Sequence, residues 1–263
     1  MANDDTQDHT RQPPPEQDQD EPMPLVAHLI ELRNRLLKAV LAVLVAFLGV
    51  YPFANILYGW LSDPLRAYLP ENATMIATDV ASPFFAPLKL ALVVAVFIAI
   101  PFILYQIWSF IAPGLYRHEK RLAFPLLFSS VILFYAGAAF AYFVVFPLVF
   151  GFFTSVGPTE VQMMTDISSY LDFVLKMFFA FGVAFEIPIA TVLLILSGMT
   201  TAEDLAAKRP YVVVACFIIG MLLTPPDVIS QSLLAVPMWL LFEVGILFGR
   251  MVERPQEEPP EES

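Results

Sequence analysis

The stretch LKLALVVAVFIAIPFILYQIWSF, residues 88–110, is apolar along almost its whole length. A helix needs about 20 predominantly apolar residues to cross the ~30 Å hydrocarbon core of a bilayer. This stretch is long enough, so it predicts a membrane-spanning helix.

Similar apolar blocks occur along the rest of the chain, 58% of whose 263 residues are hydrophobic. They predict an all-α integral membrane protein with six transmembrane helices. The third block, residues 122–153, is longer than a bilayer requires and should tilt or protrude. The fifth block, residues 211–223, has about 13 residues, which cover only ~20 Å at ~1.5 Å per residue. We expect spans five and six to be short, as a hairpin turned at Pro225 and Pro226. The other five blocks are 36–53, 122–153, 170–196, 211–223 and 228–248.

The two ends of the chain differ in composition from its body. Residues 1–22 and 253–263 hold 12 of the 25 acids but two of the 14 bases, with many Pro and Gln residues. We expect both to be disordered tails flanking one membrane domain, 23–252. The formal charge of −11 therefore says little about partners. The single cysteine, Cys216, excludes an intrachain disulfide and favours a packing role.

The placement of lysine and arginine predicts the orientation in the membrane. Nine bases of the body and Arg254, just beyond it, fall on one side of the six blocks, and only Arg66, Lys89 and Lys176 fall on the other. The richer side is expected to be cytoplasmic. With an even number of spans, both termini are then cytoplasmic.

Residues 24–36 carry leucines at helical spacing and predict a short amphipathic helix along the cytoplasmic interface, leading into span one. Glu31 and Arg35 stand four residues apart, in the order that favours a surface ion pair. A plain surface pair and a binding role both remain open for Glu31 on spacing alone.

Glu119 lies within a basic run, GLYRHEKR, residues 114–121, between spans two and three. An acid at this place would favour the N-terminus of the following helix or neutralise its neighbours. Spacing alone does not separate those roles from a binding role.

Glu186 is the deepest carboxyl of the predicted spans, ~15 Å or more from either end of block four. A carboxyl at that depth normally faces a bundle interior, a cavity or a partner. Pro188, two residues later, predicts a kink. The alternative is a protonated packing residue. Lys176 lies nearer the external end, where it can snorkel, and is interpreted as structural.

No nucleotide-binding loop, metal-ligand cluster or nucleophile–base motif is evident, so the chain is expected to be no enzyme and to need no metal or cofactor. We also expect no nucleic acid partner. A secondary transporter and a structural scaffold remain alternatives, although no convincing internal repeat of the transporter type is found.

Six motifs occur together in order over residues 24–252, and they resemble the TatC family, the multispanning receptor subunits of the twin-arginine protein translocase. The motifs are HLIELRNRLL, MIATDVASPFF, YQIWSFIAPGLYRHEKR, FYAGAAFAYFVVFPL, KRPYVV and GMLLTPPDVISQ. The resemblance implies six helices in a concave, glove-like bundle in the bacterial inner membrane. It also implies a multimeric complex with TatA- and TatB-type single-span subunits, driven by proton-motive force, that exports folded cargo.

The resemblance also assigns roles to residues of this chain. The implied cytoplasmic site for twin-arginine signal peptides comprises Glu31, Arg33, Phe110, Arg117, His118, Glu119, Lys120 and Arg121. Glu186, Met221, Thr224 and Gln231 match intramembrane positions that contact partner helices. Pro64 and Asp227 match functional positions in external loops.

Overall fold

The computed structural model describes residues 25–66, 76–111, 120–156, 166–223 and 228–252. Within these ranges the chain is helical, and a single β-bridge joins Ile76 to Asp166. The helices are α1 (Leu25–Val50), α2 (Ala54–Arg66), α3 (Ser82–Ile111), α4 (Lys120–Phe140), α5 (Phe146–Val156), α6 (Ile167–Ala184), α7 (Ile187–Leu196), α8 (Ala202–Ala207), α9 (Arg209–Leu223) and α10 (Val228–Val252). A short 3₁₀ turn, η1 (Tyr51–Phe53), and a π turn, η3 (Ala141–Val145), link neighbouring helices.

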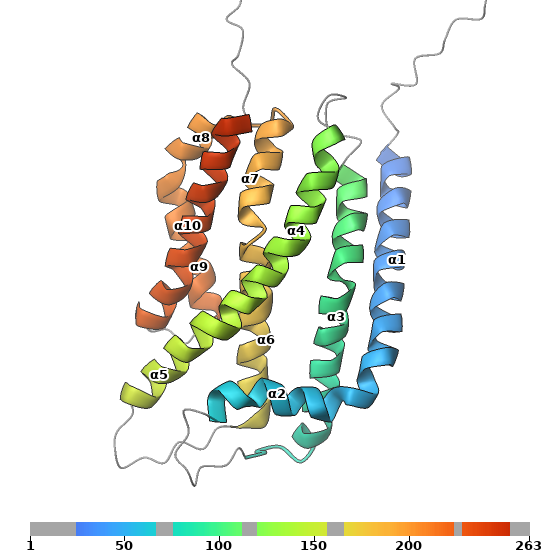
Figure 1. The fold of residues 1–263 in the computed structure, drawn as a ribbon, viewed down its shortest axis with the longest axis vertical. Coiled ribbons are helices and arrows are strands. Elements are labelled where there is room, and N and C mark those ends of the chain that lie inside the picture. The colour runs from blue at the N-terminus through green and yellow to red at the C-terminus, as the bar shows by residue number, and fades with distance from the viewer. Residues whose placement is uncertain (1–24, 67–75, 112–119, 157–165, 224–227, 253–263) are drawn as a thin grey trace, which may run out of the picture.

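Five of the described helical segments are long and apolar enough to cross a membrane, and α9 is a shorter apolar helix. This arrangement confirms the all-α membrane fold with six helices. The N-terminal end of α1 and the C-terminal end of α10 lie at the same end of the bundle, as an even number of crossings requires (Figure 1). The ends of α3 and α4 that flank residues 112–119 lie there too (Figure 1). We call this end of the bundle the terminal end, and the opposite end, where α2 lies, the α2 end.

The first helix differs from its prediction. Residues 25–36 do not form a separate interfacial helix, because α1 runs without a break from Leu25 to Val50. The sequence has no Pro or Gly between Leu25 and Leu48, so nothing interrupts the backbone hydrogen bonds. Pro52 ends the helix, and the chain then turns into α2, which lies across the foot of the bundle (Figure 1). The crosswise helix is therefore α2, which was predicted only as part of a connection.

The third block forms one oblique rod, α4–η3–α5, that crosses the other helices (Figure 1). The predicted tilt is thus confirmed. Pro125 lies in the first turns of α4 and does not break it. Pro147 has no N–H to donate, and its ring would clash with the carbonyl one turn earlier. The wider π turn Ala141–Val145 precedes it and makes room for that ring.

The fourth block is divided at Glu186, as the position of Pro188 predicted. Helix α6 ends at Ala184 and α7 begins at Ile187, with Pro188 in its first turn. Two non-helical residues, 185 and 186, therefore separate a longer and a shorter part of this span.

The fifth and sixth blocks form the predicted hairpin of α9 and α10. Arg209 donates two hydrogen bonds of 2.7 Å to Glu243, one to each carboxylate oxygen. Helix α9 has 15 residues and is short, as expected. The expectation of a short sixth span needs a correction, because α10 has 25 residues, enough to cross the bilayer. It continues past residue 248, since Gly249 packs against Ile195 of α7 and the next residues remain helical.

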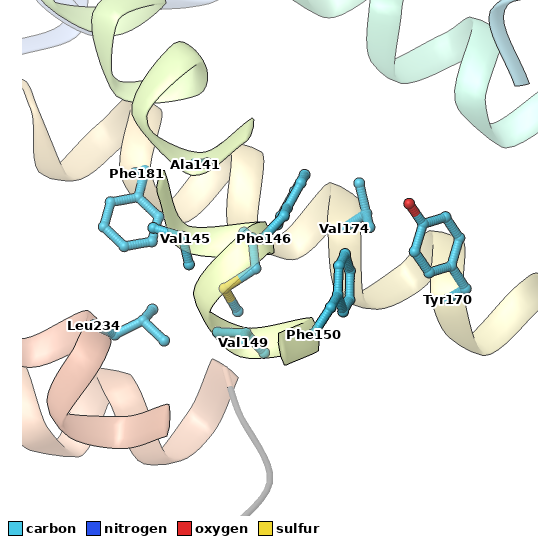
Figure 2. Packing of buried hydrophobic residues seen from close by; sticks show 10 residues of the cluster. Ala141, Val145, Phe146, Val149, Phe150, Tyr170, Val174, Phe181 and Leu234 are labelled. Carbon is cyan, nitrogen blue, oxygen red and sulfur yellow. The ribbon is translucent and has the colours of Figure 1, made fainter. Parts of the chain in front are cut away.

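One cluster of the core, which includes four aromatic rings, lies where α5 meets α6 and α10. Phe146 and Phe150 of α5 face Phe181 and Tyr170 of α6, and Leu234 of α10 closes the cluster (Figure 2). The Tyr170 hydroxyl donates a 2.7 Å hydrogen bond to the carbonyl of Leu61 in α2. This bond holds the crosswise helix against the bundle.

Glycines allow the closest helix contacts. A Cβ at Gly137 of α4 would collide with the backbone carbonyl of Phe181 in α6. Gly245 and Gly249, one turn apart on α10, lie against Thr191 and Ile195 of α7. Small residues at such spacing let membrane helices approach until their backbones nearly touch.

At the α2 end, Asp166 joins the segment before α3 to the start of α6. Its carboxylate accepts hydrogen bonds from the Ser169 N–H at 2.9 Å and from the Thr78 N–H and hydroxyl at 3.1 and 2.9 Å. The bonds from Ser169 and then Thr78 hold the pKa of Asp166 well below its ordinary value. Asp166 is thus both the N-cap of α6 and an anchor for the segment at Thr78.

We expect Asp166→Ala to lower the thermal unfolding midpoint in detergent at neutral pH, because it removes the cap and the anchor together. Because the folded state lowers this pKa, the contribution is present above about pH 4 and is lost as the pH falls further. As the pH is lowered from about 5 to 3, the unfolding midpoint of the variant should therefore fall less than that of the native chain. Thr78→Val should reproduce part of the effect, and Glu203→Ala on α8 should not. Parallel pH curves for native and variant would contradict this role.

Candidate functional site

A first cluster lies at the terminal end of the bundle, where α1 meets the last turn of α3. The ring of His28 on α1 stacks on Phe110 of α3, with centroids 4.2 Å apart and planes inclined by 24°. Glu31 follows His28 by one helical turn. The structure therefore brings two predicted residues, Glu31 and Phe110, to neighbouring positions.

Glu31 is half-buried and forms an ion pair with Arg35. The Nε and Nη2 atoms of Arg35 lie 2.9 and 2.5 Å from the same carboxylate oxygen, Oε1. The second oxygen, Oε2, takes part in neither bond. The surface pair predicted from spacing is confirmed, and it leaves one carboxylate oxygen for a further donor.

Arg33 points elsewhere. It is exposed, and its guanidinium donates to the side-chain oxygen of its neighbour Asn34 at 3.2 Å. Arg117, His118 and Glu119 lie outside the described residues. Lys120 and Arg121 open α4, but their side chains are not described.

A second cluster surrounds Glu186 at the break between α6 and α7. Its carboxyl lies beside the hydroxyl of Ser130 on α4. Ser130 is fully buried and accepts a 3.3 Å hydrogen bond from the indole N–H of Trp108 on α3. Glu186 Oε1 is buried and has no hydrogen-bond partner in the described part of the chain. A buried acceptor without a donor is costly in a membrane, so this carboxyl needs either its own proton or a donor that reaches it.

Two of the remaining predicted positions, Met221 and Gln231, lie in the hairpin of α9 and α10. Gln231 of α10 donates a 2.7 Å hydrogen bond to the carbonyl of Phe217 and so joins α10 to α9. Met221 is exposed on α9. Thr224 and Asp227 lie outside the described residues, and the side chain of Pro64 in α2 is not described.

Sequence reasoning missed three members of these clusters. His28 had a local signal, since it precedes Glu31 by one turn in HLIELR. Ser130 is one of two serines in an otherwise apolar run, FPLLFSSVILF, which marks a polar contact without naming its partner. Trp108 had no such signal, because only tertiary packing brings it to Ser130.

Comparison with known proteins identifies the family. The family model described as Sec-independent protein translocase protein (TatC) matches residues 27–237. The chain belongs to the TatC family. A TatC protein of Azotobacter chroococcum mcd 1 is 64% identical over 92% of this chain and 94% of its own length. That of Escherichia coli K12 is 60% identical over 86% of this chain and 88% of its own.

A solved structure of the same family agrees with the fold. The crystal structure of a twin-arginine translocase receptor, TatC, superposes with a TM-score of 0.78 at 41% sequence identity. It covers 86% of this chain and 100% of its own chain. TatC proteins are components of a protein translocase, so the chain is a multi-pass membrane protein and not an enzyme.

Proposed function

We propose that this chain is the receptor subunit of a twin-arginine translocase and binds the signal peptides of folded cargo at its terminal end. The observation that supports this most strongly is its 41% identity, over 86% of its length, to a protein solved as the twin-arginine translocase receptor. Family membership and the shared fold disfavour the transporter and scaffold alternatives.

In this proposal Glu31 and Glu119 each accept one arginine of the signal. A guanidinium presents a rigid donor fork that suits a carboxylate. Glu31 has one oxygen outside its Arg35 pair, and the His28–Phe110 stack beside it limits access of water. Partial shielding matters because fully exposed ion pairs contribute only ~0–1 kcal/mol.

The bases around Glu119 give the site selectivity. Arg117, His118, Lys120 and Arg121 repel ordinary basic segments, so only a peptide that satisfies both carboxylates binds well. Arg33 contributes to the same positive surface.

The terminal end, which carries most of the bases, faces the cytoplasm of a bacterial inner membrane, with the membrane domain 23–252 between tails 1–22 and 253–263. TatA- and TatB-type single-span subunits join it in a multimeric complex driven by proton-motive force. They contact Glu186 and the patch at Met221, Thr224 and Gln231, while Pro64 and Asp227 act in the external loops.

A peptide-binding measurement tests the receptor role. A twin-arginine signal peptide should bind the full chain in nanodiscs at least tenfold more tightly than its Lys-Lys variant. Glu31→Gln and Glu119→Gln should each weaken binding and crosslinking about tenfold, as for the loss of a charged hydrogen bond of ~1.5 kcal/mol.

The matched control is Glu203→Gln, which removes an exposed carboxylate of α8 at the same end of the bundle. It should leave binding unchanged. Equal binding of both peptides would contradict the receptor proposal. Undiminished crosslinking of the signal peptide to the Glu119→Gln variant would show that Glu119 is not part of the binding site.

A further inference from the structure

A groove of about 670 Å³ runs along α6 between α3 on one side and α9 and α10 on the other. Three of its lining residues are charged, and all three lie toward the α2 end: Lys89 of α3 and Asp172 and Lys176 of α6. The other lining residues are apolar and include Phe179, Val183, Ile187 and Met238.

The three charges leave one net positive charge in the groove. Lys89 forms an ion pair with Asp172, which joins α3 to α6. Lys176 follows Asp172 by one helical turn and is exposed, and none of the ion pairs formed by the described residues includes it. A lone ammonium at the head of an apolar groove suits an anionic group.

The depth of these residues matches the boundary of a lipid leaflet. The α6–α7 span has 30 residues, about 45 Å at ~1.5 Å each, so it extends ~7 Å beyond the ~30 Å hydrocarbon core at each end. This depth places Asp172 near the boundary and Lys176 one turn inside it. A lysine at that depth extends its side chain toward the headgroups.

The length of the apolar part distinguishes two kinds of occupant. From Lys176 to Ile187 the groove follows about 11 residues, ~16 Å, so from the boundary near Asp172 it reaches ~22 Å into the ~30 Å core, past one leaflet but short of the whole. A partner's spanning helix would need an apolar surface through the full ~30 Å. A phospholipid has a charged head and an apolar tail, so it fits the charged end of the groove and the apolar lining that follows it.

We propose that this groove binds one anionic phospholipid, with its phosphate at Lys176 and an acyl chain along α6 toward Ile187. Lys89 is held by Asp172 and adds a second donor only at the rim. The site is separate from the terminal-end cluster, so it does not depend on the receptor role.

The test measures lipid retention by the full chain. The protein is placed in nanodiscs of equal phosphatidylglycerol and phosphatidylethanolamine, transferred to detergent, and examined by native mass spectrometry. The native chain should retain phosphatidylglycerol in preference to phosphatidylethanolamine. Lys176→Gln should reduce that preference about fivefold, the effect of one lysine at an anionic surface. Asp172→Asn should raise the preference for phosphatidylglycerol, because this substitution releases Lys89 from its ion pair.

Two further variants separate headgroup from chain. Val183→Trp fills the groove from an exposed position and should reduce retention of both lipids. Lys208→Gln, between α8 and α9 at the terminal end, is the matched charge control and should change nothing. The proposal is overturned if Lys176→Gln keeps the native preference for phosphatidylglycerol. It is overturned too if Lys208→Gln reduces that preference as much as Lys176→Gln does. It is also overturned if a crosslinker at residue 176 captures a single-span partner helix with lipid retention unchanged.

Discussion

Gly137→Ala will destabilise the bundle, although alanine is the better helix former. A Cβ at this position collides with the carbonyl oxygen of Phe181 and lies 2.8 Å from its carbonyl carbon and 3.0 Å from Cγ of Phe185. The first two atoms belong to the backbone of α6, so relief requires α4 and α6 to separate. We expect a loss of about 1–3 kcal/mol in the free energy of unfolding. Unfolding in mixed micelles, followed by circular dichroism, measures it.

Gly49→Ala is the matched control for this prediction. Gly49 lies in α1, and nothing lies within 4 Å of a Cβ built there. The substitution should be neutral or stabilise the chain by up to ~1 kcal/mol, since alanine is favoured over glycine in a helix. Equal stability of the two variants would show that α4 and α6 do not meet as closely as described.

Glu186→Ala is expected to reduce recruitment of single-span partners about 3- to 30-fold while the chain still inserts and folds. That range corresponds to the loss of an interhelical hydrogen bond of about 0.6–2 kcal/mol in a membrane. Oε1 is the buried acceptor without a donor in the described part of the chain, and the alanine variant removes it. Site-specific crosslinking of partner helices in native membranes, together with export of a folded reporter, gives the measurement.

Glu186→Gln and Ser130→Ala separate partner contact from internal packing. Glutamine keeps an acceptor oxygen at the same place, so it should retain more recruitment than alanine. Ser130→Ala removes only the fully buried hydroxyl beside Glu186, which accepts a hydrogen bond from Trp108, and recruitment should persist. If Glu186→Ala leaves recruitment and export normal, Glu186 is a packing residue.

Hydrophobic block length accounted for most of the architecture before any tertiary information. A lipid-exposed backbone must satisfy its own hydrogen bonds, so each long apolar block becomes a helix. The same rule located the tilt of residues 122–153 and, with Pro188, the break beside Glu186. It overlooked α2, because a crosswise helix of 13 residues lacks the length that marks a span.

The sequence alone determined the family, the helical membrane fold and the depth of Glu186, since apolar length, proline positions and motif order are properties of the chain in one dimension. Only the tertiary structure decided what each polar group meets. It stacked His28 on Phe110, placed Glu186 beside Ser130, turned Gln231 to the Phe217 carbonyl and placed Lys176 in a groove. These contacts join residues of different helices or distant turns. The close approach that glycines permit fixes which helices touch, and no local pattern encodes that choice.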